Sequence, residues 1–304
     1  MRWEDYRSSD NVEDRRGQGG PGGGFGIPIP MGRGGGLGIG GLIIAGILFF
    51  VFGIDPRLVV GIDEVLNNPQ MQQRGPAQPT GQPAGKQGAP TDELGRFVAS
   101  TLAQTEDVWR QVFSAAGRRY EEPRLVMFSG ITRSACGTAQ SAMGPFYCPI
   151  DKRVYLDTSF FRDLRDRFRA PGDFAAAYVI AHEIGHHVQN LTGILPQVQQ
   201  RRQAVSPAES NALSVRTELQ ADCLAGVWAH HADSKLKTLE PGDIEKALAA
   251  ASAIGDDRMQ RQTQGMVVPE SFTHGSSKQR MTWFMRGVKT GSMQQCDTFS
   301  ERNL

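Results

Sequence analysis

Residues 179–189, with the sequence VIAHEIGHHVQ, hold the motif that decides the fold and the chemistry of this 304-residue chain. On an α-helix each residue turns by about 100°, so side chains four positions apart differ in direction by only about 40°. The imidazoles of His182 and His186 can therefore reach one metal ion, with Glu183 beside it. This is the HExxH pattern of zinc peptidases, in which the glutamate takes a proton from the attacking water. The motif predicts His182 and His186 as zinc ligands and Glu183 as the catalytic base.

The residues around the motif predict a helix from Asp173 to Leu191, with Asp173 as the N-cap and Gly193 just beyond the end. Apolar side chains recur along this window at steps of three and four residues, which indicates that most of the helix is buried. Paired histidines also occur on exposed helix faces, where they bind nothing. Polar side chains on a buried helix need a polar partner, however, and a metal ion satisfies them together.

A catalytic zinc ion usually takes three protein ligands and leaves one position for water, so the motif requires another donor. One subclass has a third histidine six residues after the second, with a glycine at position 189. This chain has Thr192 and Gln189 there, which excludes that subclass. The better candidate for the third ligand is Glu218, in the segment TELQADCLAG of residues 217–226.

Glu218 should lie on a second long helix. Ser206 and Glu209 form a capping box with a proline after the serine, and the helix should run to about His231. Asp222 follows Glu218 by four residues on the same face, where its carboxylate can accept the second ring N–H of a ligating histidine. The alternative for this pair is two solvated charges on a helix face. The apolar and small residues around the pair favour the metal site instead.

Residues 91–304 predict an α+β fold that is mainly helical, with a small β-sheet. A helix should begin at Thr91, and strands are expected at residues 124–128 and 153–157. A short helix should follow the second strand, and another helix should span residues 242–264. If the strand at 153–157 is outermost in the sheet, an extended substrate can pair with its edge.

The first ninety residues differ from the rest because many of the 36 glycines and 17 prolines lie there. Residues 1–36 are predicted to be disordered. Residues 37–54 carry no charge and are just long enough for a transmembrane helix, which needs about 17–25 residues. A buried core helix does not suit disordered flanks, and a cleaved signal peptide would be too long and lacks a suitable cleavage site. Residues 55–90 are predicted to be a linker rich in Pro, Gln and Gly.

The basic residues near the apolar run mostly precede it, at Arg15, Arg16 and Arg33, and Arg57 follows it. The positive-inside rule then predicts a single-pass protein of the inner membrane. Its N-terminus would lie in the cytoplasm, and its catalytic domain would lie outside the cytoplasm.

Four cysteines allow three pairings. Outside the cytoplasm disulfides are permitted. Cys136 with Cys148 would then close the loop before the strand at 153–157, and Cys223 with Cys296 would tie the C-terminal residues to the second long helix. Free buried thiols are the alternative for Cys223 and Cys296.

Several segments together resemble the bacterial neutral zinc metallopeptidases, a family typified by a single-pass membrane protein. The segments are HEIGHHVQ (182–189), ELQADC (218–223), GPFYCP (144–149), VYLD (154–157), SFTHGS (271–276) and SDNVEDRR (9–16). The resemblance covers nearly the whole chain. It implies a zincin-like domain with a gluzincin-like site, in which His182, His186 and Glu218 hold one zinc ion and Glu183 is the base. It implies no particular substrate.

A peptidase also needs a donor that stabilises the oxyanion formed when water attacks the amide carbon. His274 is the candidate, because it lies in a turn-rich stretch and resembles the histidine segment downstream of the metal site in related membrane gluzincins. Arg280 is the alternative donor, with a structural ion pair as its other role. A lone histidine in a loop is also often a structural residue.

Together these features predict a membrane-anchored metallopeptidase that uses one catalytic Zn²⁺ ion to hydrolyse a peptide or protein substrate. A net charge of +1 argues against nucleic acid as the main partner. The other hypothesis is a non-catalytic, peptidase-like binding or scaffold protein of the cell envelope, in which the metal is structural or absent. The intact Glu183 favours the enzyme, because a structural metal site needs no base.

Overall fold

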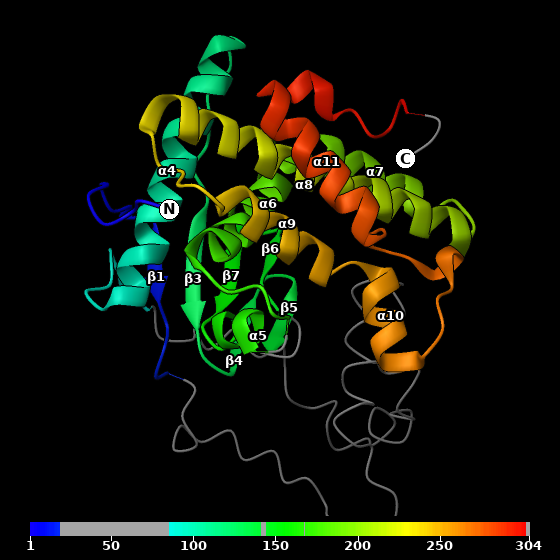
Figure 1. Ribbon diagram of the computed structural model, residues 1–304, viewed down its shortest axis with the longest axis horizontal. Helices are drawn as coiled ribbons and strands as arrows, with labels where there is room; N and C mark the ends of the chain where they lie inside the picture. The colour runs from blue at the N-terminus through cyan, green and yellow to red at the C-terminus, as the bar shows by residue number, and fades with distance from the viewer. Residues whose placement is uncertain (19–84, 141–143, 167, 302–304) are drawn as a thin grey trace, which may run out of the picture.

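The computed structural model of the chain describes residues 1–18, 85–140, 144–166 and 168–301 (Figure 1). The predicted transmembrane helix (37–54) and most of the predicted linker lie outside these ranges. Among the described residues, no helix is both long enough and apolar enough to cross a bilayer.

The main sheet of the described chain has five strands in the order β2-β1-β3-β7-β6. These strands are β1 (Val12–Asp14), β2 (Lys86–Gln87), β3 (Arg124–Phe128), β6 (Phe146–Cys148) and β7 (Arg153–Asp157). The central strand β3 pairs in parallel with β1 and β7, and the outer strands β2 and β6 run antiparallel to their neighbours. A separate hairpin consists of β4 (Ile131–Ser134) and β5 (Gly137–Gln140).

The two predicted strands are present as β3 and β7, so the prediction of a small sheet is confirmed. The strand at 153–157 is not outermost, however, because β6 pairs with it through Tyr147 and Val154. The outermost strand on this side of the sheet is therefore β6, and the suggested peptide-binding edge at β7 is wrong.

Residues 1–18 are part of the folded domain, so the prediction of disorder throughout residues 1–36 is wrong for this segment. Val12 is buried in β1, and Trp3 lies in the main core with its ring edge against Phe97. The indole Nε1 of Trp3 donates to Asp173 at 2.9 Å. The prediction failed because it averaged composition over 36 residues, whereas a three-residue strand is stabilised by pairing with distant β3.

The place of β1 in the sheet also bears on the predicted membrane orientation. Two strands of one sheet must lie on the same side of a bilayer, because their backbones are hydrogen-bonded to each other. Residues 1–18 and β3 therefore share one compartment. A cytoplasmic N-terminus with the catalytic domain across the membrane does not fit this fold, since one crossing at 37–54 would separate β1 from β3.

The helices cover most of the remaining described residues (Figure 1). They are α4 (Glu93–Ala115), α5 (Phe160–Asp166), α6 (Asp173–Leu191), α7 (Ile194–Arg202), α8 (Pro207–Leu236), α9 (Asp243–Ala253), α10 (Asp256–Gln264) and α11 (Ser277–Thr290), with 3₁₀ turns η2 (Pro269–Ser271) and η3 (Met293–Cys296). Helix α6 has the predicted bounds, although its N-cap is Gly172, and the Asp173 carboxylate instead accepts from Trp3. The capping box of Ser206 and Glu209 begins α8 as predicted.

The helix predicted at 242–264 is broken into α9 and α10 around Gly255. A Cβ atom at Gly255 would lie 2.5 Å from the backbone nitrogen of Ser277, at the start of α11. Asp257 of α10 accepts hydrogen bonds from the Ser277 backbone and hydroxyl. The break is therefore a tertiary feature, since it lets the start of α11 pack between the two helices.

Helix α6 contacts the sheet through β6 and β7 and also packs against α8, which in turn packs against α11 (Figure 1). Helices α6 and α8 lie close together at Gly185. A Cβ atom at this position would lie 2.9 Å from the carbonyl oxygen of Ala221. A larger residue at 185 would push the helices apart. The motif glycine thus brings the two histidines of α6 within reach of α8.

All four cysteines are paired as predicted. The Cys136–Cys148 disulfide ties the turn between β4 and β5 to β6. The Cys223–Cys296 disulfide joins α8 to η3 near the C-terminus.

Candidate metal centre

Side chains from α6 and α8 converge at one point. His182 Nε2 lies 3.1 Å from one carboxylate oxygen of Glu218, and His186 Nε2 lies 3.6 Å from the other. The ligand atoms of the three residues all lie within 4.8 Å of one another. Two imidazoles and a carboxylate are a donor set that catalytic zinc takes. These residues therefore suit a metal ion, and the sequence predicted all three.

The other ring nitrogen of each histidine has its own acceptor. His182 Nδ1 lies 2.9 Å from Asp222 Oδ1, the contact that the sequence spacing predicts, and His186 Nδ1 lies 2.9 Å from Gln189 Oε1. Ionised carboxylates and amide oxygens only accept, so each Nδ1 carries a hydrogen. In the neutral rings, both Nε2 lone pairs then face Glu218, which is the tautomer that a metal ligand needs.

The charges around the site favour a cation. Burial lowers the pKa of His182, but the Asp222 carboxylate outweighs burial and holds this pKa at about 10. Burial raises the pKa of Glu218, but the imidazoles of His186 and His182 outweigh burial and keep it well below the usual value. The two carboxylates thus stabilise positive charge between them, which a bound metal ion would supply in place of the protons.

Asp222 is itself held by a buried network. Arg280 donates to both of its oxygens at 2.8 and 2.9 Å, and the Tyr178 hydroxyl donates to Oδ1 at 2.5 Å. Arg280 is only 2% exposed. Burial opposes ionisation of Asp222, but Arg280 and His182 outweigh it and lower its pKa to about 2. The guanidinium of Arg280 thus forms the structural ion pair that was the other role predicted for this residue.

Glu183 is 7% exposed, and burial raises its pKa above the usual value for a glutamate. Its position on α6 follows from the motif, one residue after the first ligand. A carboxylate with a raised pKa is a better proton acceptor in catalysis than an ordinary surface glutamate.

His274 lies in the loop before α11, and its position is fixed by Asp256 at the start of α10. Asp256 accepts from the backbone N–H groups of Thr273, His274 and Gly275, and its other oxygen lies 3.2 Å from His274 Nδ1. Burial lowers the pKa of His274, but Asp256 and Glu218 outweigh burial and raise it.

Sequence reasoning missed Asp256 and Tyr178. Tyr178 lies four residues before His182 on the same helix face, and this spacing was a usable signal. For Asp256 no local pattern points to a loop eighteen residues away.

Comparison with known proteins agrees with this geometry. Residues 1–299 match the family described as "Putative neutral zinc metallopeptidase". The chain belongs to this family. No solved structure matches the chain.

The relatives of this zinc metallopeptidase family member are bacterial. The chain is 49% identical over 315 residues to "Uncharacterized protein YpfJ" of Escherichia coli K12, with 99% of each chain covered. It is 45% identical over 226 residues to "Uncharacterized protein Rv2575" of Mycobacterium tuberculosis H37Rv, covering 70% of this chain and 74% of that protein. The same figures hold for "Uncharacterized protein Mb2605" of Mycobacterium bovis.

Proposed function

We propose that the chain is a zinc-dependent metallopeptidase that hydrolyses peptide bonds in peptide or protein substrates. The observation that supports this most is the convergence of both histidine Nε2 atoms on Glu218, beside the buried Glu183. A zinc ion held by His182, His186 and Glu218 would supply a Lewis acid that activates water at neutral pH and polarises the scissile carbonyl.

Residues of the chain itself transfer the proton from the attacking water to the leaving amine. Glu183 takes a proton from the attacking water as the new C–O bond forms. It passes that proton to the amine nitrogen as the C–N bond breaks, and so returns to its carboxylate form. Asp222 and Gln189 hold the imidazoles of His182 and His186 in the ligating tautomer.

The alternative function is a non-catalytic binding or scaffold protein, and cleavage of an unfolded protein separates the two. The full chain should generate new peptide N-termini, detected by mass spectrometry, and Glu183→Gln should not. If the two proteins give the same products at the same rate, the metallopeptidase proposal fails.

We assign to His274 the role of donor to the oxyanion. Removing one such donor typically lowers turnover by about 10²- to 10³-fold. His274→Ala should therefore lose kcat on this scale and retain its zinc. Asp256→Asn should show a smaller loss with the same sign, because it loosens His274 without removing it.

The matched control for His274 is His230→Ala. His230 lies in the last part of α8, and its ring contacts the backbone oxygen of Val288 on α11. Its kcat should stay within about twofold of wild type, as for most changes away from a site. If His274→Ala and His230→Ala have the same kcat, His274 takes no part in catalysis.

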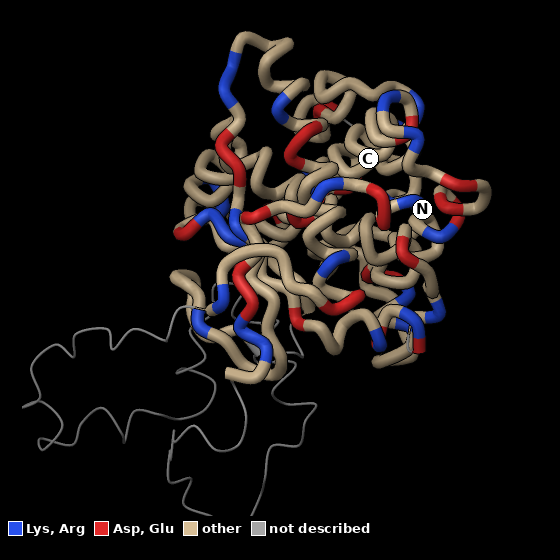
Figure 2. Tube along the Cα trace, turned by 90° about the vertical axis from the view of Figure 1, so that its left-hand side faces the viewer, with Lys and Arg blue, Asp and Glu red and all other residues tan. Residues whose placement is uncertain are grey.

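The proposal also concerns the compartment in which the folded domain lies. Two disulfides favour a compartment outside the cytoplasm. Alkaline phosphatase fused after residue 301, which is active only outside the cytoplasm, tests this location: an inactive fusion counts against it. A single membrane crossing at residues 37–54 is not proposed again, because β1 and β3 belong to one sheet. The expectation that nucleic acid is not a partner stays a prediction. Lys and Arg residues alternate with Asp and Glu residues along the described parts of the trace (Figure 2).

A further inference from the structure

Gln189, which accepts from His186 Nδ1, also forms hydrogen bonds to α8. Its Nε2 donates to the backbone oxygen of Thr217 at 2.8 Å and to Gln220 Oε1 at 3.0 Å. A backbone oxygen only accepts, so the amide orientation of Gln189 is determined, and its oxygen must face His186. Gln189 is fully buried and joins a ring nitrogen on α6 to two groups on α8.

The next residue of this network reaches the C-terminal part of the chain. Gln220 accepts from Gln189 and donates through Nε2 to the backbone oxygen of Cys296 at 3.0 Å. Cys296 is joined to Cys223, which lies three residues after Gln220 on α8. A continuous path therefore runs from His186 through two glutamine amides to a disulfide-bonded residue.

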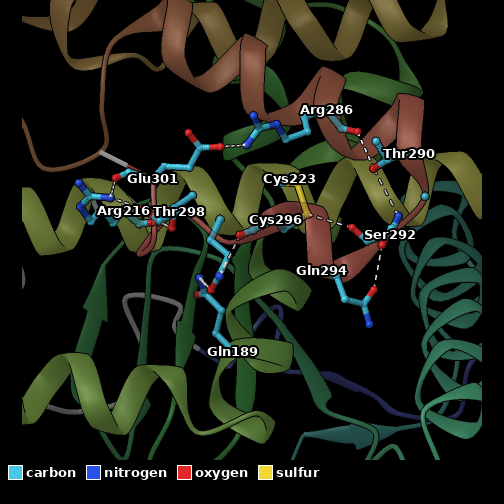
Figure 3. The surroundings of a disulfide bond; sticks show 12 residues. Gln189, Arg216, Cys223, Arg286, Thr290, Ser292, Gln294, Cys296, Thr298 and Glu301 are labelled. Carbon is cyan, nitrogen blue, oxygen red and sulfur yellow. Dashed lines mark hydrogen bonds and ion pairs between the residues drawn. A yellow bond between two sulfur atoms is a disulfide. The ribbon is translucent and has the colours of Figure 1, made fainter. Parts of the chain in front are cut away.

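Residues 292–301, here called the C-terminal tail, are held along α8 at further points (Figure 3). Arg216 donates to the backbone oxygens of Thr298 and Glu301, and the Thr298 hydroxyl donates to the Arg216 backbone oxygen at 2.7 Å. Figure 3 shows the disulfide between α8 and the tail, with Gln189 below them. The Cys296 carbonyl is thus fixed relative to α8 by groups on both sides of it.

The two histidine ligands are oriented by different means. His182 faces a carboxylate that Arg280 neutralises, whereas His186 faces a neutral amide. The Gln189 N–H groups donate to the Thr217 backbone oxygen and to Gln220 Oε1, and these two bonds keep the amide oxygen turned toward His186. The Gln189–Gln220–Cys296 path supplies one of these two restraints and connects it to the C-terminal tail.

We propose that the C-terminal tail positions His186 through Gln189 and Gln220, and that the Cys223–Cys296 disulfide is required for full zinc affinity. This inference rests on the proposed zinc site. It adds to that site two positioning glutamines and a disulfide that lie outside the HExxH motif. Outer partners of histidine ligands typically account for about 10- to 100-fold in metal affinity.

The experiment measures the zinc dissociation constant of the full chain by competition with a chromophoric chelator. Gln189→Leu removes the acceptor at His186, and Gln220→Leu breaks the path while leaving both disulfides intact. Each should weaken zinc binding by about 10- to 100-fold. Because the glutamines act in series, the double variant should bind zinc no more weakly than Gln189→Leu alone.

The role of the Cys223–Cys296 disulfide is tested with the other disulfide of the chain as a control. Replacing Cys223 and Cys296 by serine should weaken zinc binding about as much as Gln220→Leu does. Replacing Cys136 and Cys148 by serine removes the disulfide of the β4–β5 hairpin and should leave zinc affinity within about twofold. Thermal unfolding of each metal-free variant identifies any that do not fold.

The outcomes separate this inference from the function on which it rests. A wild-type chain that binds no zinc overturns both. A wild-type chain that binds zinc, with Gln220→Leu equal to it, overturns only the role of the tail. Additive losses in the double variant do the same, because they show that Gln220 does not act through Gln189.

Discussion

Replacing Glu183 by glutamine should lower kcat by about 10²- to 10⁴-fold, which is the usual contribution of a general base. Glutamine keeps the shape of the side chain but cannot take a proton from water. The site should still bind zinc, because Glu183 is not among the three converging ligands. The measurement is kcat on an unfolded protein together with the zinc content of the same preparation.

The control for this prediction is Glu270→Gln, which makes the same chemical change at an exposed position in η2. Its kcat and zinc content should equal those of wild type. A Glu183→Gln protein that keeps zinc and cleaves at the wild-type rate would contradict the metallopeptidase proposal, because the cleavage would not depend on the base beside the proposed ligands. Loss of zinc from that variant would instead show that Glu183 is needed to assemble the site.

Replacing Asp222 by alanine should lower the free energy of unfolding by about 3–5 kcal/mol, because it leaves the buried Arg280 without its carboxylate. The same change removes the acceptor at His182 Nδ1 and should weaken zinc binding by about 10- to 100-fold. Urea denaturation of the metal-free chain gives the first quantity, and chelator competition gives the second.

A double variant distinguishes the two roles of Asp222. Asp222→Leu with Arg280→Leu removes the buried pair together, and apolar replacement of such pairs is often neutral for stability. This variant should recover stability but not zinc affinity. If Asp222→Ala is as stable as wild type, the buried ion pair is not what holds α8 and α11 together. If the double variant binds zinc normally, Asp222 does not orient His182.

The motif helix and its ligands were predictable because the signals were local. Periodic apolar residues gave the bounds of α6, and a four-residue step put His182 and His186 on one face. Glu218 was found because a catalytic zinc site needs a third ligand and α8 has a clear capping box. The cysteine pairs were likewise predicted from the expected compartment, and both are present.

The features that sequence reasoning missed depend on contacts between distant residues. Strand β1 has only three residues, and its stability comes from pairing with β3 more than a hundred positions later. Arg280 carries no sign of its partner Asp222, which lies on another helix. Gln189 and Gln220 belong to no metal-site motif, because amides become informative only when their acceptors are known.

The zinc content of the purified full chain and of Glu218→Ala, determined by atomic emission, tests the central claim most directly. His182, His186 and Glu218 should hold about one zinc ion per wild-type chain, as a three-ligand catalytic site does. Glu218→Ala should retain little zinc after dialysis and should still fold. A wild-type chain that takes up no zinc, or a Glu218→Ala chain with the wild-type amount, would contradict the proposed centre.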